Sequence, residues 1–159
     1  MKNEYNPEFH TVRGYQLKNK KQGQLTPALE DYLEMAYRMC MEEDYVRVGK
    51  LSHQLHVKPP SASKMVLRLV ELGYLEYDQY DSIRLTKKGK EKGAYLLERH
   101  DIIEQFLRMI GNSNPLEEAE LIEHSLSAST ISKIKILVKF FTTNPDIAAQ
   151  YKDFKRSAK

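Results

Sequence analysis

The fold is decided by residues 57–77, which read VKPPSASKMVLRLVELGYLEY. Pro60 suits the first turn of a helix, and Gly73 suits the left-handed residue that ends one. Between them, apolar residues recur at i, i+3, i+4 and i+7, the spacing of one buried helical face. They are Ala62, Met65, Val66, Leu69 and Leu72. This stretch therefore predicts an amphipathic helix followed by the first strand of a hairpin.

The neighbouring residues extend this helix into a winged helix-turn-helix. A short helix is predicted over about 49–56, and a short strand over 46–48 precedes it. Residues 74–78 and 83–85 alternate apolar and polar side chains, which predicts a hairpin. The order helix, strand, helix, turn, helix, hairpin is that of a winged helix-turn-helix, whose second helix can enter the major groove of DNA.

Longer helices are predicted on both sides of this unit. Thr86 is a good N-cap for the helix that follows it, and Gly111 ends that helix. Asn114, with Glu117 three residues later, predicts a capping box at the start of the next helix. The predicted helices cover about 26–42, 87–110, 114–126 and 128–154, the last one interrupted near Pro145.

The expected fold class is therefore mostly α, in three parts. Residues 1–24 are polar and mostly aperiodic, which predicts a flexible N-terminal arm. Residues 25–90 form the predicted winged-helix DNA-binding domain. Residues 91–159 form a predicted helical domain for metal binding and dimerisation.

Composition excludes several classes of protein. Of the 159 residues, 41% are hydrophobic and 30% are charged, an ordinary balance for a soluble protein. The chain has no run of about 18 apolar residues that could span a membrane, and its first residues lack the apolar core of a signal peptide. Its single cysteine, Cys40, cannot form an intrachain disulfide. We therefore expect a cytoplasmic protein with no membrane partner.

Charge is divided between two regions. Residues 47–90 carry nine Lys or Arg against four Asp or Glu, whereas residues 100–126 carry one Arg against six acids. A basic block suits a polyanion and an acidic block suits cations. We expect the side chains that contact DNA to come from the second short helix, its preceding turn and the hairpin. They are Lys58, Ser61, Ser63, Lys64, Arg68 and Arg84.

Three sets of acids and histidines have the spacing of one helical face. They are Asp31 with Glu34, His100 with Glu104, and Glu120 with Glu123 and His124. Each residue alone also fits a solvated helix surface, so only their conjunction indicates a site. The last set adjoins apolar residues, where a carboxylate costs free energy unless a cation pairs with it. Few Lys or Arg lie nearby in the sequence, so we expect a divalent cation. Carboxylates with imidazoles suit Mn²⁺ or Fe²⁺, and a set without Cys argues against a thiolate zinc site.

Five stretches of the chain form a specific, ordered set of motifs. They are TPALEDYLEMAYRM at 26–39, VKPPSASKMVLRLVELGYLEY at 57–77, LTKKGKEKG at 85–93, ERHDIIEQFLRMIG at 98–111 and LIEHSLS at 121–127. In these stretches the chain resembles the manganese transport regulators, a branch of the diphtheria toxin repressor family. The resemblance covers about residues 25–145. It implies a transcriptional repressor, not an enzyme, that represses manganese-uptake genes when Mn²⁺ is plentiful. The expected partners are a palindromic double-stranded DNA operator and a second copy of the chain.

The resemblance also implies a site for two Mn²⁺ ions per chain, in which Fe²⁺, Co²⁺ or Cd²⁺ could substitute. Carried over by motif position, its ligands are Asp31, Glu34, His100, Glu120, Glu123 and His124. Asp31 and Glu120 are carboxylates where the iron-dependent branch has sulfur ligands, which favours Mn²⁺ over Fe²⁺. Ser125 departs from relatives that have a second histidine there. Metal bound by ligands from both halves would set the spacing, in a dimer, of the two recognition helices, which are the helices that enter the major groove. We place dimerisation in the broad apolar stripes of residues 87–142.

The sequence is also compatible with other functions. An iron-responsive regulator, or a winged-helix regulator of a small organic ligand, would use the DNA-binding half equally well. The small-ligand regulator would leave the three sets of acids and histidines as coincidence. A metal-dependent hydrolase is disfavoured because the chain lacks HExxH, GxSxG and a glycine-rich phosphate loop.

Overall fold

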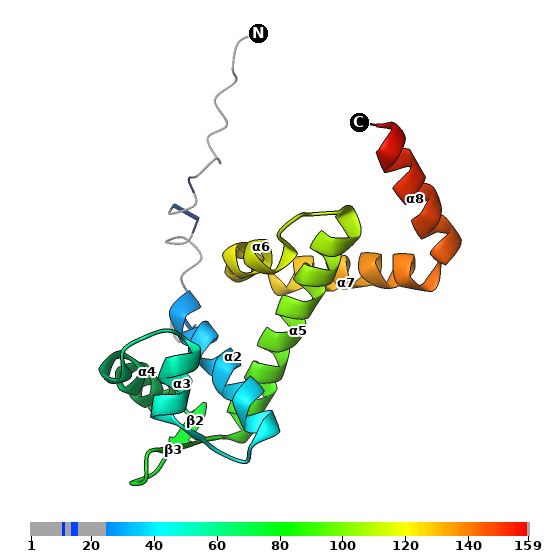
Figure 1. Ribbon diagram of the computed structural model, residues 1–159. Helices are drawn as coiled ribbons and strands as arrows, with labels where there is room; N and C mark the ends of the chain where they lie inside the picture. The colour runs from blue at the N-terminus through cyan, green and yellow to red at the C-terminus, as the bar shows by residue number, and fades with distance from the viewer. Residues whose placement is uncertain (1–10, 12–13, 16–24, 159) are drawn as a thin grey trace.

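The computed structural model describes residues 11, 14–15 and 25–158, so the predicted arm lies almost entirely outside the described residues (Figure 1). The described chain forms two units joined by one long helix, which confirms the predicted fold class. The first unit contains α2 (Pro27–Glu42), β1 (Val46–Arg47), α3 (Val48–Gln54), α4 (Pro59–Glu71), β2 (Leu75–Tyr77) and β3 (Ser82–Leu85). The joining helix and the second unit are α5 (Lys87–Ile110), α6 (Pro115–Ile122), the 3₁₀ turn η1 (Glu123–Ser125), α7 (Ala128–Thr143) and α8 (Pro145–Ser157).

Side-chain caps and a glycine set the helix ends largely as the sequence predicts. The Thr26 hydroxyl accepts a hydrogen bond from the Leu29 amide at the start of α2, and Thr86 caps α5 in the same way. Gly111 ends α5 with φ of 81°, a conformation that glycine adopts without steric cost. The capping box expected at Asn114 is wrong, because the Asn114 amide donates to the Glu117 carboxylate and does not cap the backbone.

The three strands form one small antiparallel sheet in the order β1-β3-β2. Leu75 pairs with Leu85 and Tyr77 with Ile83, so β2 and β3 form the predicted hairpin, which is the wing. The strand predicted at 46–48 is one residue shorter, because Val48 already belongs to α3. With α3 and α4 beside it, the sheet completes a winged helix-turn-helix.

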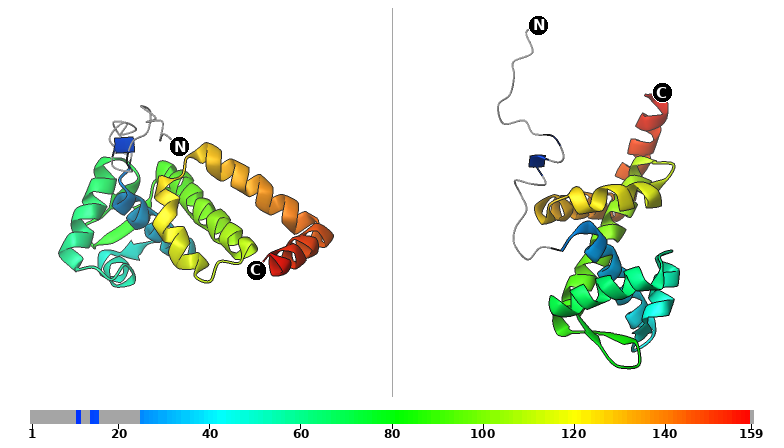
Figure 2. Two further views of the ribbon diagram at one scale, coloured as in Figure 1. Left: turned by 90° about the horizontal axis from the view of Figure 1, so that it is seen from above. Right: turned by 90° about the vertical axis from the view of Figure 1, so that its left-hand side faces the viewer.

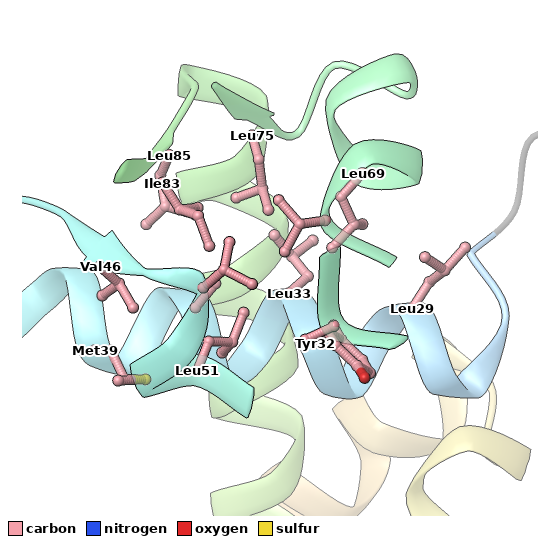
Figure 3. Packing of buried hydrophobic residues seen from close by; sticks show 14 of the residues in the cluster. Leu29, Tyr32, Leu33, Met39, Val46, Leu51, Leu69, Leu75, Ile83 and Leu85 are labelled. Atoms are coloured by element: carbon pink, nitrogen blue, oxygen red, sulfur yellow. The ribbon is translucent and has the colours of Figure 1, made fainter. Parts of the chain in front are cut away.

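The core of the first unit lies where α2, α4 and the sheet meet (Figure 3). Leu33, Leu51, Leu69 and Ile83 come from four different elements, and each side chain is completely buried. Removing such a side chain leaves a cavity and costs about 2–5 kcal/mol. Leu96 of α5 belongs to the same core, so the N-terminal part of α5 is packed into the first unit.

The second unit is built on the C-terminal part of α5. Ile103 and Leu107 pack against Ala119 of α6 and Ile131 of α7 in a separate, smaller core. Both α6 and α7 lie against this part of α5, and α8 runs on beyond them (Figures 1 and 2). Among the described helices, none combines the length and apolar character that a membrane span requires. Since α5 contributes to both cores, the two units share a rigid element.

Candidate metal centre and nucleic-acid interface

The most compact group of metal-ligating side chains joins α5 to the end of α6 and η1. One ligand atom each of His100, Glu120 and Glu123 lies within 4.8 Å of the other two. His100 Nδ1 is 2.9 Å from Glu123 Oε2 and 3.3 Å from Glu120 Oε1. His100 and Glu123 are buried, while Glu120 is exposed at the rim. His100 was predicted as a ligand from one sequence motif and Glu120 and Glu123 from another, and the fold places the three together.

The remaining predicted ligands approach from α2 and η1. His124 Nε2 lies 2.9 Å from Asp31 Oδ1, which joins η1 to α2. Glu34 is buried one turn further along α2, and Arg38 holds its Oε1 at 2.7 Å. Four of the six predicted ligands line one pocket of about 220 Å³, and they are Asp31, Glu34, His100 and Glu120. The other two, Glu123 and His124, contact members of that group directly.

A break in the helix gives the last two ligands their positions. The sequence predicts one helix to about Leu126, but α6 ends at Ile122 and a single 3₁₀ turn follows. Ser127 then caps α7 by accepting a hydrogen bond from the Thr130 amide. The tight turn lets Glu123 face α5 while His124 reaches α2.

Cations lie closer to this cluster than the sequence suggests, which corrects the expectation that few Lys or Arg are nearby. Arg99 is almost fully buried and donates to Glu30 Oε2 at 2.8 Å and to Glu123 Oε1 at 3.0 Å. Lys92 lies 3.1 Å from Glu30 Oε1. Neither Glu30 nor Arg99 was predicted to belong to the site. The available signals were weak: Glu30 shares a helical face with Glu34, and Arg99 precedes His100.

The carboxylates and basic side chains of the cluster shift one another's pKa values strongly. Burial alone would raise the pKa of Glu30, but hydrogen bonds from His124 and Arg99 lower it to about 2. Hydrogen bonds to Asp31 and Glu30 raise the pKa of His124 to about 9. Burial together with the neighbouring Glu123 raises the pKa of Glu120. The surroundings of Glu120 therefore disfavour its ionised form.

The donor set fits a divalent cation. Carboxylate oxygens and imidazole nitrogens converge from three segments, and they suit ions that accept mixed oxygen and nitrogen ligands. Glu104, the i+4 neighbour of His100, is turned toward Arg108, with its Oε2 4.0 Å from His100 Nε2. It therefore lies at the edge of the cluster.

The predicted DNA-binding side chains lie on α4, its preceding turn and the wing. Lys58, Ser61 and Lys64 are exposed at the N-terminal end of α4, and Arg84 is exposed on β3. Arg68 is exposed but paired with Glu71 at 2.7 Å. Ser63 differs from the others because it is half-buried. Together with Lys64 and Arg68 it lines a groove beside Leu29 and Leu67.

Models of one protein family match both halves of the chain. The model described as "Iron dependent repressor, N-terminal DNA binding domain" matches residues 24–83. The model described as "Iron dependent repressor, metal binding and dimerisation domain" matches residues 86–151. These matches support DNA and a second copy of the chain as partners, and a divalent metal as ligand.

Similar proteins are regulators of the same kind. The HTH-type transcriptional regulator MntR of Lysinibacillus sphaericus (strain C3-41) is 42% identical over 124 residues, which cover 77% of this chain and 89% of that protein. The MntR of Bacillus pumilus (strain SAFR-032) is 41% identical over 129 residues, covering 80% and 90%.

Solved structures agree with these relatives. The metal-dependent transcriptional regulator MtsR has a TM-score of 0.65 and 28% identity, and the manganese regulator SloR has 0.62 and 27%. Each comparison covers 73% of this chain but 55% of the solved chain, so our chain spans about half the length of these structures. Together with the matches above, they confirm the family resemblance: the chain belongs to the iron-dependent repressor family of metal-dependent, DNA-binding transcriptional regulators, in the branch that contains the MntR proteins.

Proposed function

We propose that this chain is a Mn²⁺-activated repressor of manganese-uptake genes that binds two ions per chain. The observation that carries the proposal is the convergence of six predicted ligands from α2, α5 and the α6–η1 segment. They are Asp31, Glu34, His100, Glu120, Glu123 and His124. The names of the MntR relatives support manganese, and so do the hard carboxylates at Asp31 and Glu120. Fe²⁺, Co²⁺ and Cd²⁺ are expected to substitute in vitro.

The activation mechanism follows from which elements the ligands connect. Ions held by these residues would supply positive charge beside the four carboxylates of the ligand set. Asp31 and Glu34 belong to α2, which packs against the recognition helix α4 in the first core. Glu120, Glu123 and His124 belong to the segment that leads into α7. Coordination by both sets would pin the α6–α7 region to α2 and thereby fix the recognition helices of a dimer relative to each other.

The second unit offers an apolar surface for the homodimer. Leu121 is 71% exposed on α6, and Ile136 is 68% exposed on α7. Phe140 lies one turn beyond Ile136 and is 46% exposed. Apolar side chains gathered at helical spacing on a surface mark an interaction site. We infer that the two copies meet through α6 and α7, within the predicted range 87–142.

On this proposal the dimer binds a palindromic operator in double-stranded DNA. The two recognition helices would enter half-sites about one helical turn apart. The six predicted contact residues are Lys58, Ser61, Ser63, Lys64, Arg68 and Arg84. The division into an arm (1–24), a DNA-binding domain (25–90) and a metal-binding domain (91–159) also stays a prediction.

Calorimetric titration of metal-free protein with Mn²⁺ tests the proposal. We expect close to two ions per chain, reduced in Glu120→Gln and Glu123→Gln and retained in Glu117→Gln, whose exposed carboxylate lies outside the cluster. Mn²⁺ should also tighten binding to an operator fragment, measured by fluorescence anisotropy. If Glu123→Gln still binds two ions and responds fully to Mn²⁺, the assigned site is wrong.

The same two assays, repeated with other divalent metals, separate the alternative functions. An iron-responsive regulator would bind Fe²⁺ under anaerobic conditions with a stronger effect on DNA affinity than Mn²⁺ has. A small-ligand regulator could use the groove of about 650 Å³ between the start of α2 and α4, whose lining includes Leu29 and Leu67. Unchanged DNA binding in the presence of every divalent metal would favour that function.

A further inference from the structure

Glu30 lies behind the predicted ligand set and holds three basic side chains. Its Oε2 is 2.8 Å from Arg99 Nη1 and 2.9 Å from His124 Nδ1, and its Oε1 is 3.1 Å from Lys92 Nζ. The Glu30 side chain is 13% exposed, so these contacts satisfy a largely buried carboxylate. Lys92 and Arg99 belong to α5 and His124 to η1, and Glu30 itself to α2. One carboxylate therefore connects three elements.

The contact with Glu30 decides which ring nitrogen of His124 is available to bind a metal ion. An ionised carboxylate can only accept a hydrogen bond, so His124 Nδ1 must carry the hydrogen that it shares with Glu30. Arg99 Nη2 also approaches Nδ1, at 3.1 Å, but a protonated Nδ1 cannot accept from it. That Arg99 nitrogen instead donates to Glu123 Oε1 at 3.0 Å. His124 is left with Nε2 facing Asp31, where a ligand atom is needed.

Arg99 orients Glu123 in a similar way. The Arg99 side chain is 5% exposed and extends between Glu30 and Glu123. Its hold on Glu123 Oε1 leaves Oε2 directed toward His100, 2.9 Å away. Arg99 Nε has no hydrogen-bond partner among the residues that the structure describes. Burying Arg99 Nε without such a partner costs free energy. This burial is explained if the two Nη groups are needed to hold Glu30 and Glu123 in place.

We propose that Glu30 and Arg99 are positioning residues of the metal centre: Glu30 presents Nε2 of His124 toward Asp31, and Arg99 presents Oε2 of Glu123 toward His100. The inference rests on the proposed function, because it assigns roles around the same site. Residues that orient metal ligands through hydrogen bonds typically change metal affinity by about 10–100-fold when they are replaced. We expect losses in that range for both residues.

Charge alone predicts a different outcome, which makes the proposal testable. Replacing Arg99 by an uncharged residue removes a positive charge near the ions, so electrostatics alone would strengthen Mn²⁺ binding. Arg99→Lys keeps the charge but loses the planar pair of donors. A positioning role therefore predicts weaker binding in both Arg99→Gln and Arg99→Lys.

The experiment is Mn²⁺ calorimetry on the full chain with four variants and a control. The variants are Glu30→Ala, Glu30→Gln, Arg99→Lys and Arg99→Gln. Glu30→Gln keeps an oxygen that can accept from His124, so we expect it to lose less affinity than Glu30→Ala. The control is Glu98→Gln, which removes an exposed acid beside Arg99 that pairs with Lys135, and its affinity should stay within about twofold of wild type.

A second measurement determines directly which ring nitrogen of His124 carries hydrogen. In Cd²⁺-loaded protein labelled with ¹⁵N, long-range ¹H–¹⁵N spectra should show His124 with hydrogen on Nδ1 and metal on Nε2. Glu30→Ala should give mixed tautomers, a change that mere loss of stability would not produce. Glu30→Gln and Arg99→Lys provide the result if Glu30→Ala does not fold.

The outcomes distinguish this inference from the proposed function. If wild-type protein does not bind Mn²⁺, the proposed function fails. If wild type binds Mn²⁺ while Arg99→Lys and Glu30→Gln match it within twofold and His124 keeps one tautomer in every folded Glu30 variant, the positioning role alone is refuted. Tighter binding in Arg99→Gln would show that Arg99 acts only through its charge.

Discussion

Gly93 offers a sharp test of how closely α2 and α5 are packed. A methyl group at this position would lie 2.6 Å from Cβ of Tyr37 and 2.7 Å from the nearest ring atoms, well inside van der Waals contact. The Tyr37 Cβ cannot move away by rotating the side chain, because it is bonded directly to the α2 backbone. Gly93→Ala therefore forces the two helices apart.

Two opposing effects determine the size of the change. Alanine favours a helix over glycine by about 1 kcal/mol, while overpacking typically costs about 1–3 kcal/mol. Because the clash reaches the backbone-linked Cβ of Tyr37, we expect overpacking at the upper end of this range and a net loss of about 1–2 kcal/mol. Gly49 provides the matched control, since a Cβ there meets nothing within 4 Å. Gly49→Ala should stabilise the fold by about 0.4–1 kcal/mol.

Urea unfolding of metal-free protein, at one fixed protein concentration, measures both variants. The free energies of unfolding should move in opposite directions. Mn²⁺ affinity should fall in Gly93→Ala alone, because α2 carries Asp31 and Glu34 away from their partners on α5 and η1. If Gly93→Ala is as stable as Gly49→Ala and binds Mn²⁺ equally well, the close approach of α2 to α5 described above is incorrect.

Three further predictions concern charge and assembly. The pKa of Glu30 is lowered to about 2, so the stability that comes from its ionised form should be complete above about pH 4.5 and be lost as the pH falls toward 2. Acid unfolding curves of wild type should therefore show a loss of at most about 3 kcal/mol in the free energy of unfolding, which Glu30→Gln should lack. Ile136→Glu should shift the dimer toward the 18.6 kDa monomer in sedimentation velocity, whereas Lys152→Glu, at an exposed position of α8 outside the proposed interface, should have less effect, and an unchanged dimer in both would place the interface elsewhere. Lys64→Gln should reduce the slope of log affinity for operator DNA against log salt by about one, and an unchanged slope would mean that Lys64 contacts no phosphate.

Most of the fold could be predicted because its signals are local. Helical periodicity identified α4, and the threonine cap and Gly111 identified both ends of α5. The errors arose where local signals compete. Asn114 has a sequence typical of a cap, yet its backbone conformation (φ −127°, ψ 59°) and its bond to Glu117 replace the capping bond.

The candidate site was predictable to a lesser extent. The six proposed ligands follow motif spacing, so the sequence indicated them although their joint geometry depends on the fold. Glu30 and Arg99 are 69 residues apart, and Arg99 and Glu123 are 24 apart. Helical periodicity relates residues three or four positions apart, so it cannot reveal pairs this distant in the sequence. The expectation of few nearby cations was wrong for the same reason: proximity along the chain misjudged proximity in space.

The shared helix α5 limits what a metal ion could regulate. Leu96 fixes α5 to the winged helix through the first core, and the Glu30–Arg99 pair ties α2 to α5 with no metal involved. The recognition helix should therefore be folded and attached to α5 in the metal-free protein. The 3₁₀ turn η1 differs, because its attachment to α2 consists of polar contacts from His124 to Asp31 and Glu30. In the proposed mechanism, metal then acts at η1, between α2 and the helices that form the dimer, and it changes the spacing of two preformed DNA-binding units.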